Sequence, residues 1–294
     1  YITENIHLIK KIKEVILIDN FNTQRYHSIF NLKKGVKFTF LKLDLSTQPL
    51  NKIKKANYVI HCASLTNAEG SFKIKKEMFK NNLNCMKNII NYCKKNKSKL
   101  IHISSTSVYG KQADIVNEDD NHLLKPQSPY AEIKLIEEKL LINSKNKIIY
   151  NTFRFGTIAG VSKGIRFHTA INKFCLDVAL NKSVKIYKTA FNQYRPYLSL
   201  KDAFKVFKFC IEKEFFKNEI FNVLSGNYTV QQIINMIKKY KKNIRIKFVS
   251  NKIMNQLSYK VDDFKLRKEG IALKSSISKD IQETLGLFNN INNK

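Results

Sequence analysis

The sequence predicts an α/β protein with a doubly wound parallel sheet and a smaller C-terminal lobe. Two observations carry this prediction. Short runs of residues that are apolar on both faces alternate with helical segments, which is typical of parallel strands covered by helices on both sides. The alternation is regular to about residue 160 and loosens beyond it. We therefore expect two domains, at residues 1–160 and 161–294, with some segments of the second returning to the sheet.

The expected elements follow from these apolar runs. In the first domain, strands are predicted at residues 14–19, 37–44, 58–63, 100–105 and 148–154. One helix with apolar residues at Phe79, Met86 and Ile90 precedes the fourth strand, and another follows Tyr130. In the second domain, the predicted helices are 201–213 and 229–240, and the predicted strands are 220–223 and 244–249.

The composition is that of an ordinary globular protein except for its charge. The chain has 294 residues, of which 43% are hydrophobic and 26% are charged, so it can bury a substantial core. A formal net charge of +30 would suggest a nucleic-acid or membrane partner. The lysines are scattered over the whole length, however, and this favours solvated faces over a dedicated nucleic-acid surface. Such a field would still attract an anionic substrate.

The cysteines and the lengths of the apolar runs indicate the cellular compartment of the protein. The five cysteines form no C-x-x-C pair and lie in apolar or helical surroundings, which indicates reduced core residues without a metal site or disulfides. No apolar run reaches the roughly 18 residues of a membrane-spanning helix, and the pattern of a signal peptide is absent. We expect a cytoplasmic protein that binds no membrane.

Three side chains near the middle of the chain are candidates for acid-base chemistry. Ser105 ends the strand predicted at 100–105, and Tyr130 and Lys134 lie one helical turn apart on the helix that follows. Tyrosine, with an ordinary pKa of about 10, is a poor base, but a cation one turn away stabilises its phenolate. The three residues together can remove a proton from a hydroxyl group.

The spacing of Tyr130 and Lys134 is not specific by itself. The chain contains a second Tyr-x-x-x-Lys pair, Tyr197 and Lys201, and about two are expected by chance from this composition. The second pair follows Arg195-Pro196 and has no hydroxyl-rich strand end before it. Because Tyr130 has such a strand end and a Ser-Pro helix start beside it, we predict that Tyr130 and Lys134 form the catalytic pair.

Further short motifs follow one another in an order that is hard to obtain by chance. They are Asp19-Asn20, Asp44-Leu45, His61 to Ser64, Asn82 to Asn88, Ser104 to Gly110, Tyr130 with Lys134, Arg154, Arg195-Pro196 with Asp202, Phe221 to Val223 and Lys265 to Arg267. With this series the chain resembles the extended short-chain dehydrogenase/reductases, in particular their NAD-dependent nucleotide-sugar epimerase/dehydratase group. The resemblance covers almost the full length and implies a Rossmann-like NAD-binding domain followed by a substrate-binding lobe.

The resemblance also implies the cofactor and the residues that hold it. Asp19 corresponds to a carboxylate that binds the adenosine ribose diol and would repel a 2′-phosphate, which favours NAD over NADP. The alternative is that Asp19 is a turn or helix-capping acid. The full set of cofactor-binding residues implied in this way is Asp19, Asn20, Asp44, Leu45, Cys62, Ala63, Ser64, Asn82, Tyr130 and Lys134.

One part of the family pattern is missing. Tyr1-Ile2 matches the residues just after the second glycine of the family's Gly-rich turn, and Thr3 stands where the third glycine would be. We expect a chain truncated at its N-terminus, whose first strand and phosphate-binding turn lie outside the sequence. The strand at 14–19 would then lack its neighbour toward the strand at 58–63. A degenerate, non-catalytic protein is the alternative.

The implied reaction is a transient oxidation of a sugar. Ser105, Thr106, Tyr130 and Lys134 are the catalytic candidates, while Ser105, Thr157 and Arg195 are expected to contact a nucleotide-sugar. Relatives that eliminate water carry acids at the positions of Thr106 and Ser107, so dehydration is disfavoured. We expect an epimerase acting at C4, with an NAD(P)H-dependent keto-sugar reductase or a non-catalytic nucleotide-binding scaffold as alternatives. The resemblance further implies a homodimer formed through the helices at 78–95 and 130–144.

Overall fold

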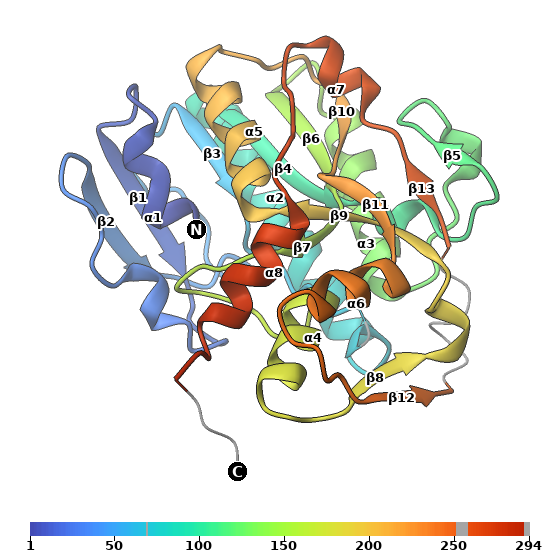
Figure 1. The fold of residues 1–294 in the computed structure, drawn as a ribbon. Coiled ribbons are helices and arrows are strands. Elements are labelled where there is room, and N and C mark those ends of the chain that lie inside the picture. The colour runs from blue at the N-terminus through green and yellow to red at the C-terminus, as the bar shows by residue number, and fades with distance from the viewer. Residues whose placement is uncertain (69, 251–257, 291–294) are drawn as a thin grey trace. The chain divides into compact units, whose positions relative to one another are not determined.

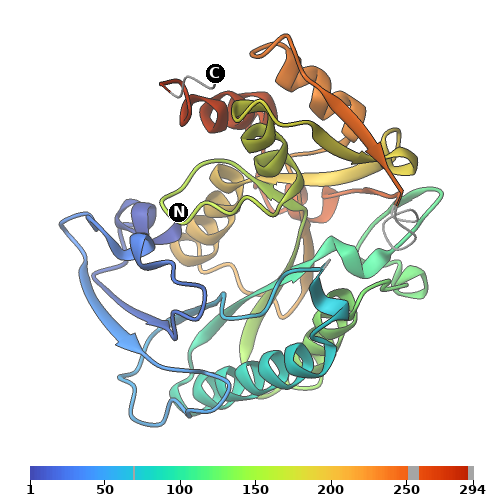
Figure 2. The same cartoon turned by 90° about the horizontal axis from the view of Figure 1, so that it is seen from below.

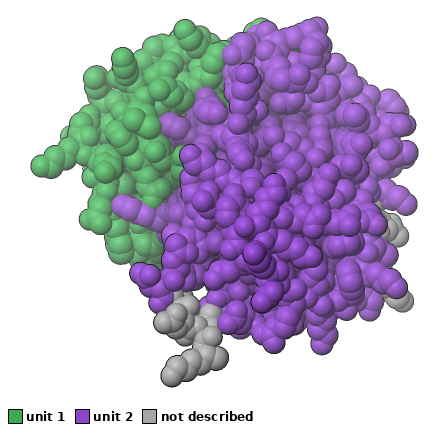
Figure 3. Space-filling model, in the orientation of Figure 1, with its two compact units in different colours: residues 1–108, 126–154, 206–221 green, residues 109–125, 155–205, 222–294 purple. Residues whose placement is uncertain are grey.

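A computed structural model describes residues 1–68, 70–250 and 258–290, and it has the α/β architecture with parallel strands that the sequence predicts (Figure 1). The chain forms two compact units, each built from separate stretches (Figure 3). Unit 1 comprises residues 1–108, 126–154 and 206–221, and unit 2 comprises residues 109–125, 155–205 and 222–294. The chain therefore crosses between the units several times, whereas the sequence predicts a change near residue 160 with some later segments returning to the sheet.

Unit 1 contains a four-stranded sheet in the order β10-β6-β4-β3. Its strands are β3 (Tyr58–His61), β4 (Lys99–Ser105), β6 (Ile149–Phe155) and β10 (Ile220–Val223), the last of which ends in unit 2. β3 and β4 are parallel. The helices α2 (Lys75–Asn96) and α3 (Pro129–Ile142) lie side by side, as Figure 2 shows, and contribute buried side chains to the core.

A separate two-stranded sheet precedes this one in the chain. After the short helix α1 (Ile2–Asn5), β1 (Glu14–Asp19) pairs in parallel with β2 (Lys37–Lys42). Within the described parts of the chain, β1 pairs with no strand except β2, and β3 with none except β4. No residue of β1 is fully buried, although its apolar run is typical of a central strand. Within the described residues, β1 and β3 therefore each lie at an edge of their sheet.

Among its described residues, unit 2 contains three small sheets and four complete α-helices. β7 (Thr157–Ala159) is parallel to β9 (Tyr194–Ser199), and β11 (Gly226–Thr229) is antiparallel to β9. The other two sheets pair β8 (Val184–Tyr187) with β12 (Ile246–Val249), and β5 (Ile115–Val116) with β13 (Lys260–Val261). The helices are α4 (Ala170–Ala179), α6 (Val230–Lys238), α7 (Phe264–Lys268) and α8 (Ile277–Gly286).

The core of unit 2 lies under α4, α6 and α8, where Ile171, Ile233 and Ile281 are fully buried together. Thr229 starts α6 with a capping box, in which its hydroxyl accepts from the Gln232 amide and the Gln232 side chain accepts from the Thr229 amide. α5 (Leu200–Glu212) begins in unit 2 and continues into unit 1. No helix among the described residues is long and apolar enough to cross a membrane.

The predicted elements are present, with shifts at their ends. The strand predicted at 37–44 ends at Lys42, because Asp44 starts a turn in which its carboxylate accepts from the amide and hydroxyl of Ser46. The strand predicted at 58–63 ends at His61. The sequence did not predict α4 or the strands β7, β8 and β9, which occupy the stretch where its alternation loosens.

Candidate active site

Ser105 lies at the end of β4 and is partly exposed. Its hydroxyl oxygen accepts hydrogen bonds from the Ser107 amide at 3.2 Å and from the Ser107 hydroxyl at 2.9 Å. A serine hydroxyl has two acceptor lone pairs and one donor. Because Ser107 occupies the acceptor side, the Ser105 proton is directed toward a further oxygen. Ser105 is thus prepared to donate a hydrogen bond.

Tyr130 and Lys134 lie on the first turns of α3, as the sequence predicts. The helix starts in the manner that its Ser-Pro signal implies, because Ser128 accepts from the Ala131 amide at 3.2 Å and Pro129 occupies the first helical position. Tyr130 is partly exposed, whereas Lys134 is only 3% exposed. One helical turn separates the two side chains.

The ammonium group of Lys134 is held inside unit 1 by a carboxylate. Lys134 Nζ lies 2.8 Å from Glu137 Oε2, and the Glu137 side chain is fully buried. Burial by itself would lower the pKa of Lys134, but the charges of Glu137 and Tyr130 outweigh it and raise that pKa. Lys134 is therefore a cation at neutral pH, as its predicted role requires.

The sequence analysis did not single out the partners of Lys134. Glu137 Oε2 also lies 3.0 Å from His102 Nε2, and His102 Nδ1 lies 3.2 Å from Thr152 Oγ1. A signal for Glu137 is present in the sequence, because an acid three residues after Lys134 shares its helix face. Nothing local in the sequence indicates His102, whose ring meets Glu137 only because β4 packs against α3.

A second buried ion pair stands beside these residues. Arg154 is 1% exposed and binds Glu138 with both Nε and Nη2, at 3.0 and 2.7 Å. The hydroxyl of Ser104 donates to the same carboxylate at 2.5 Å. This cluster joins β4, α3 and β6 behind Ser105 and makes that strand end rigid. Thr106, one of the catalytic candidates, is 2% exposed, whereas Ser105 and Ser107 on either side of it are partly exposed.

The residues expected to hold the adenosine end of NAD lie together after β1 and β2. Asn20 Nδ2 donates to Asp44 Oδ2 at 3.3 Å, and Leu45 beside it is buried. Asp19 is exposed, and its Oδ1 accepts from the Phe21 amide at 2.7 Å, which is the turn-acid role that remained open. One carboxylate oxygen of Asp19 thus serves the turn, and the exposed position suits a ribose diol.

The stretch after β3 supplies the next expected contacts. Asn82 on α2 is fully buried and binds the backbone of Leu65 at both ends of its amide, with its Oδ1 2.9 Å from the nitrogen and its Nδ2 3.2 Å from the oxygen. Asn82 thereby fixes the chain just after Cys62, Ala63 and Ser64. Cys62 occupies an exposed position, although desolvation of its thiol raises the pKa to about 11, and the buried Ser64 hydroxyl has no partner within the described residues.

The fit to NAD is partial. The ribose and active-site ends have suitable side chains in unit 1, namely Asp19, Ser105, Tyr130 and Lys134. No two of the nine glycines in the sequence are two residues apart, so the chain contains no G-x-G-x-x-G turn of the kind that cradles a pyrophosphate. The residues present would hold the nucleoside ends of the cofactor but supply no glycine cradle for its phosphates.

Of the three expected substrate contacts, Ser105 belongs to unit 1, whereas Thr157 and Arg195 belong to unit 2. Thr157 is the first residue of β7 and Arg195 is the second residue of β9, and both are partly exposed. Arg195 is the register partner of Tyr228 on β11. The neighbouring Tyr194 ring carries Lys260 Nζ at 4.2 Å from its centroid. Because successive side chains of a strand point to opposite faces, Arg195 and Tyr194 lie on opposite faces of this sheet.

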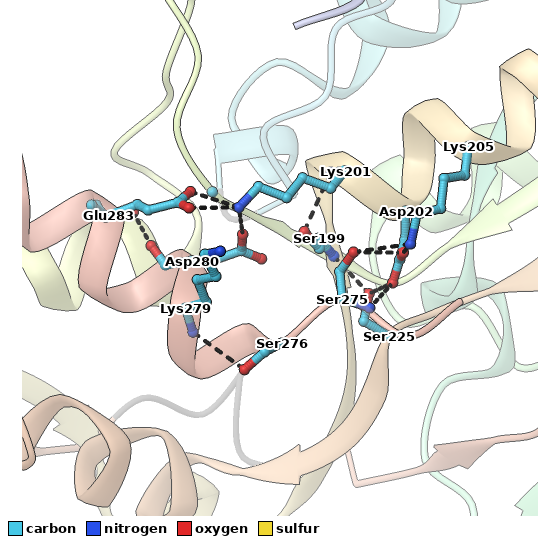
Figure 4. Close-up of polar contacts among 12 residues, drawn as sticks. Ser199, Lys201, Asp202, Lys205, Ser225, Ser275, Ser276, Lys279, Asp280 and Glu283 are labelled. Atoms are coloured by element: carbon cyan, nitrogen blue, oxygen red, sulfur yellow. Dashed lines mark hydrogen bonds and ion pairs between the residues drawn. The ribbon is translucent and has the colours of Figure 1, made fainter. Parts of the chain in front are cut away.

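The second Tyr-x-x-x-Lys pair is also in unit 2 and is built differently; Figure 4 shows its lysine, Lys201, beside Asp280 and Glu283. Tyr197 lies in β9, while Lys201 lies in α5, so the pair does not share a helix. Tyr197 is 1% exposed, and burial raises its pKa to about 12. Lys201 Nζ binds Glu283 at 2.7 and 2.8 Å and lies 3.7 Å from Asp280 on α8. Lys201 therefore links the start of α5 to α8 through ion pairs.

Asp202 completes this polar cluster (Figure 4). Its carboxylate accepts from Ser225 Oγ at 2.7 Å, from the Ser275 amide at 2.9 Å and hydroxyl at 2.7 Å, and from Lys205 Nζ at 2.7 Å. It thus joins α5 to the ends of β10 and α8. Burial alone would raise the pKa of Asp202, but these donors outweigh it and the pKa is lowered.

Comparison with known proteins identifies the family of this chain. Residues 6–223 match the model of the NAD dependent epimerase/dehydratase family. The match covers most of the chain, and the protein belongs to this family of enzymes, whose cofactor is NAD. Among curated proteins, the chain is 24% identical over 252 residues to ADP-L-glycero-D-manno-heptose-6-epimerase of Brachyspira hyodysenteriae, covering 81% of this chain and 77% of that one.

Solved structures share the fold at lower identity. The UDP-glucose 4-epimerase of Thermus thermophilus in complex with NAD has a TM-score of 0.79 and 19% identity, covering 94% of this chain and 91% of that chain. The dTDP-glucose 4,6-dehydratase DesIV of Streptomyces venezuelae with NAD bound has a TM-score of 0.84 and 14% identity, covering 97% and 90%. Epimerases and dehydratases thus resemble this chain equally well in fold, and the fold does not distinguish the two reactions.

Proposed function

We propose that this protein is a nucleotide-sugar epimerase that acts at C4 by transient oxidation to a keto-sugar. The observation that carries the proposal is the state of the two reactive groups in unit 1. Ser105 has its acceptor side filled by Ser107 and a proton to donate, and Lys134 is a buried cation one turn from Tyr130. Such a site can bind one sugar hydroxyl and remove its proton.

The protein's own residues perform the proton chemistry. Tyr130, as phenolate, takes the proton of the sugar hydroxyl, and the Lys134 cation stabilises the phenolate charge. Ser105 donates to the same oxygen and holds it in place. When bound, NAD⁺ would supply the acceptor, and later the donor, of the hydride on the attached carbon. Tyr130 then gives the proton back, so the reaction ends without net oxidation.

Two features argue against the elimination of water. By the family resemblance, dehydratases carry acids at the positions of Thr106 and Ser107, and this chain has hydroxyl residues at both. Thr106 is buried, and Ser107 is engaged with Ser105. Neither side chain can act as the general acid that a leaving hydroxyl needs at neutral pH.

The relatives and the net charge of the protein both support a nucleotide-sugar as the substrate class. The relatives named above act on sugars attached to nucleoside diphosphates, and a net charge of +30 favours an anionic ligand. Arg195 is the proposed diphosphate contact, because its planar guanidinium can bind two phosphate oxygens at once. Thr157 is the proposed sugar or nucleotide contact on the same sheet of unit 2.

Two alternatives remain distinguishable. The same three residues could serve a keto-sugar reductase, which would consume NADH or NADPH in proportion to product. An alternative of another class is a non-catalytic protein that binds nucleotides through the same residues. We also propose a homodimer, supported by the adjacent helices α2 and α3, and light scattering of the purified protein gives its mass directly.

The deciding experiment incubates the purified protein and NAD⁺ with UDP-, GDP- and dTDP-sugars, and follows sugar products and NADH absorbance together. An epimerase interconverts two sugars with no accumulation of NADH. A stoichiometric change in NADH would identify the reductase. If neither products nor NADH change for any sugar while a labelled nucleotide-sugar binds, the scaffold alternative stands and the epimerase proposal fails.

A further inference from the structure

A chain of buried polar groups leads away from Lys134 into the sheet of unit 1. Lys134 Nζ, Glu137 Oε2 and His102 Nε2 are joined by contacts of 2.8 and 3.0 Å, and His102 Nδ1 continues to Thr152 Oγ1 at 3.2 Å. The side chains of Glu137 and His102 are fully buried. Both Lys134 and His102 bind the same oxygen, since Glu137 Oε1 has no partner in the described parts of the chain.

The other titratable groups around this chain are either neutral or balanced by a partner of their own. His61 on β3 faces His102 with ring centroids 6.4 Å apart, and burial lowers its pKa to about 3. Cys85 and Cys62 are close enough to sense Lys134, and desolvation raises their pKa values to about 12 and about 11, so both thiols are neutral. The neighbouring charges of Glu138 and Arg154 balance each other in their own buried ion pair.

The charge of Lys134 is consequently balanced by Glu137. Burial opposes ionisation of Glu137, but Lys134 and His102 outweigh it, and the pKa of Glu137 falls to about 2. A buried ammonium that loses its carboxylate partner keeps the full cost of burial without compensation. Its pKa then falls, and the lysine becomes neutral over part of the working pH range.

We propose that Glu137 is a positioning residue for the reaction, which keeps Lys134 cationic and in place beside Tyr130, and that His102 holds Glu137 in turn. The inference rests on the proposed function in taking Tyr130 as the base. The Tyr130 phenolate forms readily only when Lys134 is charged. Glu137, about two helical turns from Tyr130 on α3, therefore affects the ionisation of Tyr130 through Lys134 and without contact to the substrate.

The test is a pH titration of Tyr130 by tyrosinate absorbance, obtained as the difference between the protein and its Tyr130→Phe variant. With Glu137→Gln as background, the Tyr130 titration is expected to move upward by about one pH unit. Glu138→Gln is the matched control, because Glu138 is the adjacent buried acid but binds Arg154. Its titration of Tyr130 is expected to stay where it is in the unmodified protein.

The readout needs no substrate, so its result is separate from that of the sugar panel. A Tyr130 titration that is unmoved or lower in folded Glu137→Gln overturns the proposal, even if the protein is an epimerase. If Glu137→Gln does not fold, Glu137→Asp takes its place, since it keeps the charge but withdraws it from Lys134 by one methylene. A smaller upward shift is then expected, and an unmoved titration overturns the proposal.

Discussion

The two Tyr-x-x-x-Lys pairs of this chain have the same spacing and opposite surroundings. Tyr130 and Lys134 share α3, and the lysine is buried while the tyrosine is partly exposed. In the other pair the tyrosine, Tyr197, is buried in a strand, and Lys201 is 34% exposed on the following helix. In the first pair, the phenol of Tyr130 is accessible and lies one turn from a buried cation. In the second pair, the phenol of Tyr197 is buried, and Lys201 forms ion pairs with Glu283 and Asp280 on α8.

A four-residue separation makes two side chains neighbours only if both residues lie on the same helix. On a helix, residues three to four positions apart share one face. When one residue lies in β9 and the other in α5, the same separation does not bring the side chains to one face, because side-chain directions repeat every two residues in a strand and every 3.6 residues in a helix. Tyr197 Oη has no partner among the described residues, whereas burial and Glu137 define the state of Lys134.

The largest expected effect is the difference in enzymatic activity between Tyr130→Phe and Tyr197→Phe. Tyr130→Phe removes the proposed base, and kcat/KM for sugar interconversion is expected to fall by about 10² to 10⁴-fold. Tyr197→Phe removes a buried hydroxyl without a described partner, so activity is expected to persist and the free energy of unfolding to stay the same or rise. Steady-state kinetics and urea unfolding of both variants check this. Equal loss of activity in both would remove the distinction between the pairs.

The two lysines come next. Lys134→Met leaves Tyr130 without a cation, and each unit by which the pKa of Tyr130 rises lowers its phenolate fraction about tenfold at neutral pH. We expect activity to fall about tenfold or more, with the acid limb of the pH profile moved to higher pH. Wild-type activity in Lys134→Met would show that the cation has no part in the reaction.

Lys201→Met is the matched variant in unit 2. It leaves the buried carboxylate of Asp280 without its nearest cation, and the free energy of unfolding is expected to fall by about 1–3 kcal/mol. The folded fraction should keep the activity and pH profile of the unmodified protein. A shifted pH profile in this variant would mean that Lys201 affects the chemistry after all.

The cluster around Lys201 also predicts a pH dependence of stability. Burial raises the pKa of Asp280 to about 6, while Ser199 and Lys201 partly offset that rise. Between about pH 4 and pH 6 the unfolded chain has lost a proton that the folded protein still holds, so this contribution to stability falls as the pH rises. Relative to the unmodified protein, Asp280→Asn should gain stability across that window and stay level above it, as measured by urea unfolding.

Asp202→Asn provides a control of opposite sign. Its pKa is lowered in the folded protein, so its contribution is present above the ordinary carboxyl pKa and is lost as the pH falls. The variant should therefore be less stable than the unmodified protein at neutral pH, with the deficit shrinking in acid. If both variants respond to pH in the same direction, the assignment of the two carboxylates is wrong.

The smallest expected effects concern two serines that support other groups. Ser107→Ala removes one of the two donors to Ser105 and should lower kcat by only a few-fold, because the Ser107 amide remains. Ser225→Ala removes a donor to Asp202 and should lower the free energy of unfolding by about 1 kcal/mol, with activity unchanged. Kinetics and unfolding of the two variants therefore separate a loss of rate from a loss of stability.

Much of unit 1 could be predicted from the sequence because its signals are local. The strand from Lys99 to Ser105 and the helix after Ser128 are marked by apolar runs and a Ser-Pro start, and the ordered motifs identified the family. The region after residue 160 was predicted less well. β7 and β8 have only three and four residues, and they are held by pairing with strands far along the chain.

The sequence alone predicts the fold class, the positions of Ser105, Tyr130 and Lys134, and hydroxyl residues in place of acids at Thr106 and Ser107. These features depend on residue type and on spacing within one element. The tertiary structure was needed to show that His102 meets Glu137 behind Lys134, and that Lys201 forms an ion pair with Glu283 on α8. These two contacts join residues 35 and 82 positions apart. The charge of such groups depends on the balance between burial and the partners that the fold brings to them, and that balance cannot be read from residue spacing.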